Sequence, residues 1–127
     1  MSDSQYSKHD LEERTFHFAQ EIRKCLKTVK VHPLQYDDAK QLIRSSGSVA
    51  ANYIEANESL SKKDFIMRIK NSRKEAKETI LWLKLLDLPD LYIKESTELM
   101  KILVLYLKSQ SELLRICKIR IYGLFSI

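Results

Sequence analysis

Residues 41–88 read QLIRSSGSVAANYIEANESLSKKDFIMRIKNSRKEAKETILWLKLLDL, and this stretch decides the fold. It contains two helical patterns that are separated only by ANESLSKKD. The first pattern includes a run of small residues: Ser45, Ser46, Gly47, Ser48, Ala50 and Ala51. Small side chains let the backbones of two helices approach closely. The stretch therefore predicts a tight crossing between two neighbouring helices.

The second pattern begins with a capping signal and continues with a regular apolar stripe. Ser61 stands three residues before Asp64, as expected for the N-cap of a helix. The residues that then follow a 4-3 spacing are Phe65, Ile69, Ser72, Ala76, Thr79, Leu83 and Leu86. This spacing is typical of the seam of a helical bundle.

Similar reasoning along the whole chain predicts one all-α domain, an antiparallel up-down-up-down four-helix bundle over residues 1–127. Only 2 Gly and 2 Pro occur among 127 residues, which favours long helices joined by short turns. The predicted helices cover about 10–31, 35–57, 62–88 and 92–118. For the tail at 119–127, IRIYGLFSI, three alternatives stay open: a packed extension, an edge that pairs with a neighbour, or disorder.

Composition indicates a soluble cytoplasmic protein. The N-terminal residues carry no hydrophobic signal region, and the longest apolar run, 102–107, is far shorter than the roughly 20 residues that span a bilayer. No membrane association is therefore expected. Cys25 and Cys117 lack metal-ligand spacing, so buried thiols are favoured over a disulfide between the first and last helices.

Positive charge is concentrated in the second half of the chain. Residues 1–60 hold 8 Lys or Arg against 9 Asp or Glu, whereas residues 61–127 hold 14 against 8. Lys63, Lys70, Lys77 and Lys84 recur every seven residues, with Lys74 beside them, and we call these five residues the lysine ladder. In a monomer such a ladder is usually a solvated face. In a symmetric ring it would form a repeated basic surface for the phosphates of RNA or DNA. Lys63, Lys70 and Lys77 are expected to face away from both apolar stripes of their helix.

The second apolar stripe on the helix of the ladder includes Leu81, Trp82 and Leu85. These residues could belong to the core of one chain. A single-chain bundle needs only one seam per helix, however, and that seam is already complete. We therefore interpret the three residues as an interface between copies of the chain.

Polar residues border the predicted helix crossing. Arg44, Ser48, Asn52 and Glu55 share one helix face, and the next helix carries Glu75 and Glu78. One interpretation is a ligand or nucleic-acid site. We favour a buried structural network of Arg44, Asn52, Glu55, Glu75 and Glu78, with Arg44 forked onto Glu75 or Glu78.

The same glutamates also form two Glu-x-x-Glu words, Glu55 with Glu58 and Glu75 with Glu78. Clustered carboxylates on helices can hold Mg²⁺ for phosphate chemistry, which makes a nucleotide hydrolase an alternative. None of the three histidines joins a Glu-x-x-His word. The favoured prediction has no metal, cofactor or catalytic residue.

At QLIRSSGSVAANYIEA (41–56), SKKDFI (61–66) and KEAKETILWL (74–83) the chain resembles the four-helix-bundle family described as 23S rRNA intervening-sequence proteins. The resemblance implies a small all-α protein, a ring-like homopentamer as in several members, and an activity that is largely undefined. A structurally similar relative is a basic, nucleic-acid-binding accessory to a reverse transcriptase. The family's characteristic positions are occupied here by Arg44, Asn52, Glu55, Asp64, Phe65, Glu75, Glu78 and Trp82.

These observations together predict a non-catalytic homo-oligomer that contacts RNA or DNA non-specifically through the lysine ladder. Two alternatives from other classes remain at this point. One is the Mg²⁺-dependent nucleotide hydrolase, and the other is an assembly adaptor with no nucleic-acid role.

Overall fold

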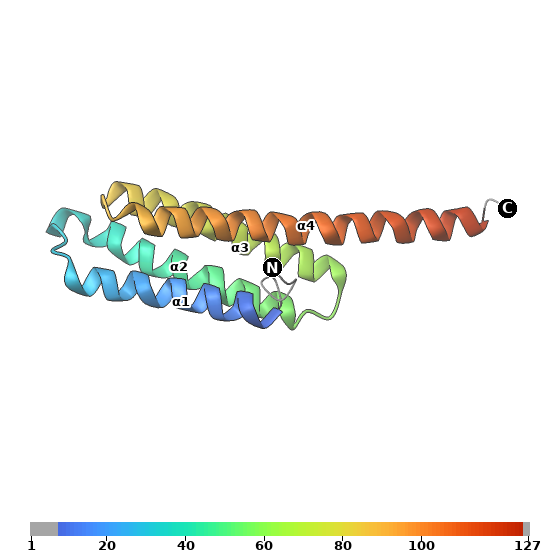
Figure 1. Ribbon diagram of the computed structural model, residues 1–127, viewed down its shortest axis with the longest axis horizontal. Helices are drawn as coiled ribbons and strands as arrows, with labels where there is room; N and C mark the ends of the chain where they lie inside the picture. The colour runs from blue at the N-terminus through green and yellow to red at the C-terminus, as the bar shows by residue number, and fades with distance from the viewer. Residues whose placement is uncertain (1–7, 126–127) are drawn as a thin grey trace.

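The structure is a computed structural model that describes residues 8–125, with side chains described for residues 10–109. Its elements are α1 (Lys8–Thr28), the 3-10 helix η2 (Pro33–Gln35), α2 (Tyr36–Asn57), α3 (Lys62–Leu85) and α4 (Asp90–Phe125). The four α-helices, with no strand among the described residues, confirm the all-α prediction. Figure 1 shows the chain turning back at each connection between them.

Local chemistry explains where the helices begin and end. Helix α1 ends at Thr28, three residues before the predicted end. Pro33 opens η2, and its cap is His32, whose Nδ1 accepts from the backbone N–H of Leu34 at 3.1 Å. At the start of α3 the backbone N–H of Asp64 donates to Ser61 Oγ at 3.1 Å, which is the predicted cap.

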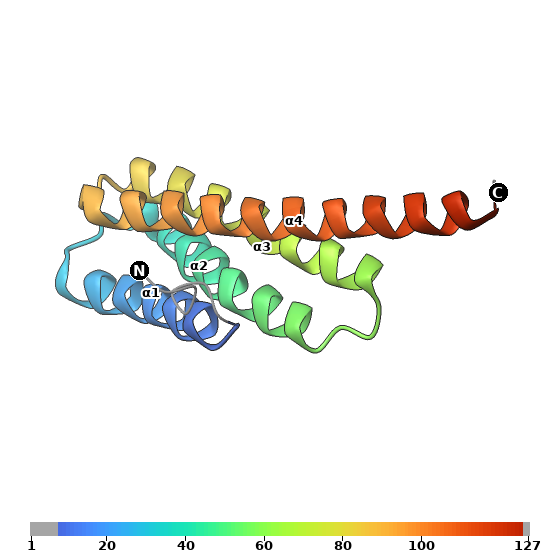
Figure 2. The same cartoon turned by 45° about the vertical axis from the view of Figure 1, so that its right-hand side comes forward.

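The predicted seam of α3 lies in the core. Ile69, Ser72, Ala76, Thr79 and Leu83 are all buried, while Phe65 and Leu86 are half-buried against the same core. Helix α3 packs along both α2 and α4, and α1 packs mainly against α2 (Figures 1 and 2). The 4-3 spacing therefore predicted the buried side of α3 correctly.

Hydroxyl groups join the helices at the points of close approach. Thr79 Oγ1 donates to Ser45 Oγ at 2.8 Å, and Ser72 Oγ donates to the carbonyl oxygen of Val49 at 2.7 Å. On the other side of α3, Ser96 Oγ of α4 donates to the carbonyl oxygen of Ala76 at 2.8 Å. Buried polar groups of this kind need such partners, so the small residues hold the crossing by hydrogen bonds as well as by close packing.

Helix α4 continues to Phe125 and takes in most of the tail, so the backbone at 119–125 is helical. Figure 1 shows this last part of α4 extending past the ends of the other helices. The side chains of 110–125 and residues 126–127 lie outside the described parts, as does the thiol of Cys117; Cys25 is buried and free. Across the described residues, no helix is long and apolar enough to cross a membrane.

Candidate nucleic-acid interface and the polar cluster beside it

The lysine ladder lies along the outside of α3. All five of its residues are exposed, and none forms an ion pair with another described residue: Lys63, Lys70, Lys74, Lys77 and Lys84. Seven residues are nearly two helical turns, so the lysines share one face. The exposed residues Lys62 and Arg73 each stand one position before a ladder residue and widen the basic surface.

The prediction that Lys63, Lys70 and Lys77 face away from both apolar stripes is wrong. Leu81 follows Lys77 by four residues and Lys74 by seven, which places it on the ladder's own face. Leu81 and Leu85 are 48% and 51% exposed. The outer face of α3 is therefore basic along most of its length and partly apolar near its C-terminal end.

Trp82 does not lie on that outer face. Its side chain is half-buried against the core, and its indole N–H donates to Glu78 Oε1 at 3.4 Å. Successive residues in a helix are rotated by about 100°, so Trp82 turns inward while Leu81 stays outside. Among the three predicted interface residues, only Leu81 and Leu85 leave substantial apolar surface uncovered.

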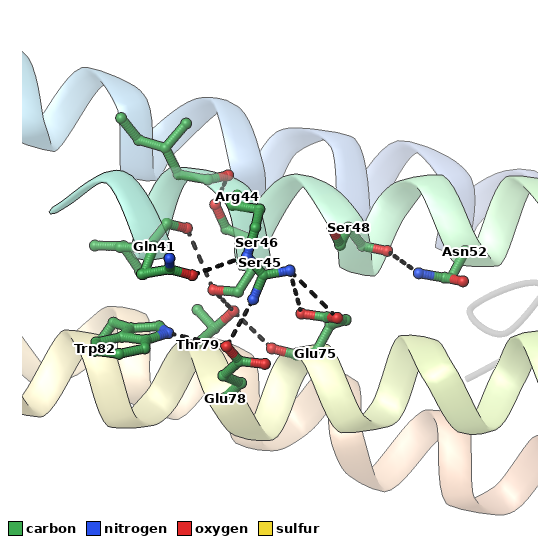
Figure 3. Close-up of polar contacts among 12 residues, drawn as sticks. Gln41, Arg44, Ser45, Ser46, Ser48, Asn52, Glu75, Glu78, Thr79 and Trp82 are labelled. Atoms are coloured by element: carbon green, nitrogen blue, oxygen red, sulfur yellow. Dashed lines mark hydrogen bonds and ion pairs between the residues drawn. The ribbon is translucent and has the colours of Figure 1, made fainter. Parts of the chain in front are cut away.

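Arg44 joins α2 to α3 by the predicted fork (Figure 3). Its Nη2 donates to Glu78 Oε1 at 2.6 Å, and its Nη1 donates to Glu75 Oε2 at 3.3 Å. Gln41 supports the arrangement from the same helix, because Arg44 Nε donates to Gln41 Oε1 at 2.9 Å. One arginine therefore bridges two carboxylates of the neighbouring helix.

The prediction that this cluster is buried is wrong. The Arg44 side chain is 45% exposed, whereas that of Glu75 is only 14% exposed. Burial acts to lower the pKa of Arg44, but its hydrogen bonds to Glu75 and Glu78 and their charges outweigh burial, so the pKa is raised. Serine and threonine hydroxyls fill the centre of the crossing, and the longer charged side chains close over its edge.

The other two members of the predicted network do not reach Arg44. Asn52 donates through Nδ2 to the carbonyl oxygen of Ser48 at 2.9 Å, within its own helix (Figure 3). Glu55 forms an ion pair with Arg68 on α3, and Arg68 also lies 4.0 Å from Asp64. The polar residues along the α2–α3 edge thus form separate clusters instead of one network.

The glutamates of the two Glu-x-x-Glu motifs likewise pair with different arginines. Arg44 occupies Glu75 and Glu78, while Arg68 holds Glu55. Within the described residues, no group of three or more His, Cys, Asp or Glu side chains is placed to hold a metal ion.

Arg23 is a bridging residue that the sequence analysis missed. Its Nη1 donates to the carbonyl oxygen of Ala19 and its Nη2 to that of Ile43, both at 3.0 Å, so it links α1 to α2. A Cβ atom on Gly47 would lie 3.0 Å from Arg23 Nη2, so the glycine leaves room for the guanidinium. The glycine inside a helical pattern was the only sequence signal for this contact.

Comparison with known proteins supplies the remaining findings. The profile of one family, described as 23S rRNA-intervening sequence protein, matches residues 7–111. A crystal structure of a protein with unknown function from the S23 ribosomal protein family of Bacteroides thetaiotaomicron is 30% identical, with a TM-score of 0.68. The alignment covers 80% of this chain and 97% of that one. None of the curated proteins matches.

Proposed function

The chain belongs to the 23S rRNA-intervening sequence protein family, and from this premise we propose that it is a non-catalytic, nucleic-acid-associated protein of the cytoplasm. In this proposal the lysine ladder contacts the phosphate backbone of RNA or DNA. The observation that carries it is that all five ladder residues are exposed and lack acidic partners among the described residues. Their charge is therefore available to a ligand.

Lysine side chains suit non-specific binding. Each presents a point charge that neutralises a phosphate and releases counterions, so affinity should fall steeply with salt. Exposed large aromatic residues, on which unpaired bases would stack, are found in the described residues at Phe16 and Tyr36, both outside α3. The ladder is therefore suited to bind phosphates and not to read bases.

Assembly into a ring-like homo-oligomer of antiparallel bundles, a pentamer as the family resemblance implies, would repeat the ladder around the ring. Leu81 and Leu85 offer uncovered apolar surface at the C-terminal end of α3, and a neighbouring copy that covers them would leave Lys63 and Lys70 outside. Repetition raises the total affinity without new kinds of contact, because each further contact is intramolecular once the first has formed.

A binding titration tests the proposal. The protein is titrated against generic RNA and DNA at several salt concentrations, with the oligomer mass measured in the same buffer. The variant Lys63→Glu/Lys70→Glu/Lys77→Glu should abolish binding while retaining its helical content. Replacing Lys40, Lys94 and Lys108 by Glu is the matched control, because these exposed lysines make the same change of charge off the ladder.

Equal loss of binding in both triple variants would show that binding depends on the net charge of the protein and not on the position of the ladder. Binding that survives the ladder variant, or that barely changes with salt, would make the ladder an ordinary solvated face. The assembly adaptor would then be the better description of the protein.

A further inference from the structure

The cations on the outer side of α3 fall into two rows. Lys62 and Arg73 stand eleven residues apart, and both are exposed. Lys63 and Lys74 repeat this spacing and are exposed as well. Eleven residues make about three helical turns, whereas neighbouring residues differ in direction by about 100°. The first pair therefore forms one row along the helix and the second pair forms another, with the exposed Lys70 between them.

The acidic residues of α3 are paired with arginines. The helix contains three of them, Asp64, Glu75 and Glu78. Arg44 holds both glutamates, and Arg68 lies 4.0 Å from Asp64. The cations of the two rows form no ion pair with another described residue. Their charge is thus not neutralised by any described carboxylate.

The positive charge of this surface is too dense and too wide for one nucleic-acid strand. Together with Lys70, the two rows place five cations within residues 62–74, which is about 18 Å of helix at roughly 1.5 Å per residue. A DNA duplex carries about one phosphate per 1.7 Å of its axis, twice the density of either of its strands. A single strand that follows one row leaves the other row without phosphates, whereas the two strands of a duplex can contact both rows.

An unpaired strand would also gain little from stacking on α3. The aromatic residues of this helix are Phe65 and Trp82, and both are half-buried against the core. Unpaired bases gain affinity by stacking on exposed aromatic side chains. Ile69, Ala76 and Leu83 are buried on the inner side of α3, which holds the rows straight. A stiff duplex fits a straight surface as it is, whereas a flexible strand would lose conformational freedom on binding.

We propose that the outer face of α3 lies along the major groove of B-form DNA, with one cation row on each of the two backbones that border the groove. An α-helix with its side chains is about 10–12 Å across, and this groove is about 12 Å wide. The major groove of duplex RNA is deep and narrow and does not offer that width. The contacts are to phosphates, so no base sequence is read.

This inference rests on the proposed function and names the form of nucleic acid that the basic surface of α3 binds. It is compatible with the proposed ring. Both rows precede Leu81 and Leu85 in the helix, so a neighbouring copy that covers these leucines leaves the rows outside.

The first test is a titration of the full-length protein against three labelled probes of one sequence. They are a DNA duplex of about one and a half turns, one of its strands alone, and the corresponding RNA duplex. Five phosphate contacts give a slope of log affinity against log salt of about −4.5 for the DNA duplex and about −3.5 for the single strand. The DNA duplex should therefore bind roughly tenfold more tightly than the single strand at about 0.1 M salt, and more tightly than the RNA duplex.

Two double variants test the rows themselves. Lys62→Ala/Arg73→Ala removes one row, and Lys63→Ala/Lys74→Ala removes the other. Each loses two phosphate contacts, so each should lower the affinity for the DNA duplex roughly 60-fold at about 0.1 M salt. A single strand can move to the row that remains, so its affinity should fall less in each variant.

Lys40→Ala/Lys94→Ala is the matched control, because these exposed lysines lie on α2 and α4 and make the same change of charge. It should retain the parent's affinity for the DNA duplex, and all three double variants should keep the parent's helical content. A single strand or an RNA duplex that binds as tightly as the DNA duplex would overturn the inference. So would a loss of duplex affinity confined to one row. The proposed function survives these two results if the ladder variant still abolishes binding, whereas failure of every probe to bind would overturn both.

Discussion

The two faces of α3 differ in what they require of the sequence. The inner face is closely packed with small and apolar side chains, and its hydroxyls are hydrogen-bonded to α2. The outer face combines lysines with two exposed leucines, and its ladder makes no ion pair with another described residue. The inner face therefore specifies the fold, whereas the outer face is free to serve partners. If substitutions on the two faces changed the free energy of unfolding by similar amounts, this distinction between the faces would be wrong.

The largest contrast is expected between two leucines of the same helix. Leu83 is fully buried, so Leu83→Ala should lower the free energy of unfolding by about 2–5 kcal/mol. Leu85→Ala removes the same atoms from a position that is half-exposed within one chain, so for a single chain it should change this free energy by no more than about 0.5 kcal/mol. Urea unfolding of both variants checks this. A loss of similar size at Leu85 would mean that another copy covers the outer face.

A hydroxyl at the helix crossing should give the next largest effect. Thr79→Val keeps the shape of the side chain but leaves Ser45 Oγ without its donor in a buried site. The expected loss is about 1–2 kcal/mol. Thr97→Val is the matched control, because among the described residues Thr97 Oγ1 bonds only to the carbonyl oxygen of Ile93 in its own helix, and Thr97 is half-buried. If thermal unfolding shows equal losses of stability in the two variants, the hydrogen bond between Thr79 and Ser45 contributes no more than a bond within one helix.

Periodicity explains why the inner face was predictable from the sequence. A stripe of side chains every three to four residues identifies the buried side of a helix wherever the core lies, so Ile69, Ala76 and Leu83 were placed correctly. The cap at Ser61 and the fork of Arg44 were also predicted correctly. The cap involves residues three positions apart, and the fork joins two helices that are adjacent in the sequence.

The remaining errors concern long side chains and neighbouring positions. Periodicity does not show how far a flexible side chain extends, so the exposure of Arg44 and the bridge made by Arg23 were not predicted. It also grouped Trp82 with Leu81, although one step along a helix turns one inward and the other outward. Periodicity also does not show that Glu55 and Glu75 pair with different arginines, Glu55 with Arg68 and Glu75 with Arg44.

Arg44 lies at the edge between the two faces and should give an intermediate effect. Arg44→Ala leaves the mostly buried Glu75 without its cation, but solvent screens the exposed half of the pair. The expected loss of unfolding free energy is about 1 kcal/mol. Lys74→Ala on the outer face is the control and should change it by less than about 0.5 kcal/mol. Equal losses of unfolding free energy in the two variants would mean that Arg44 contributes no more to stability than an exposed lysine of the ladder.

The smallest net effect is expected at Gly47, where two contributions oppose each other. Alanine is favoured over glycine inside a helix by about 1 kcal/mol. The added Cβ would lie 3.0 Å from Arg23 Nη2 and should displace the guanidinium, weakening its hydrogen bond to the carbonyl oxygen of Ile43. That loss is also worth about 1 kcal/mol. Gly47→Ala should therefore change the free energy of unfolding by less than about 0.5 kcal/mol.

A double-mutant cycle separates the two contributions at Gly47. In an Arg23→Ala background the guanidinium is absent, so Gly47→Ala should stabilise the protein by the full helix preference, about 1 kcal/mol. The coupling between the two positions, measured by chemical unfolding of all four proteins, then reports the Arg23 bridge directly. If Gly47→Ala stabilises both backgrounds equally, the guanidinium moves aside without cost. The bridge that Arg23 makes between α1 and α2 would then contribute nothing measurable to the free energy of unfolding.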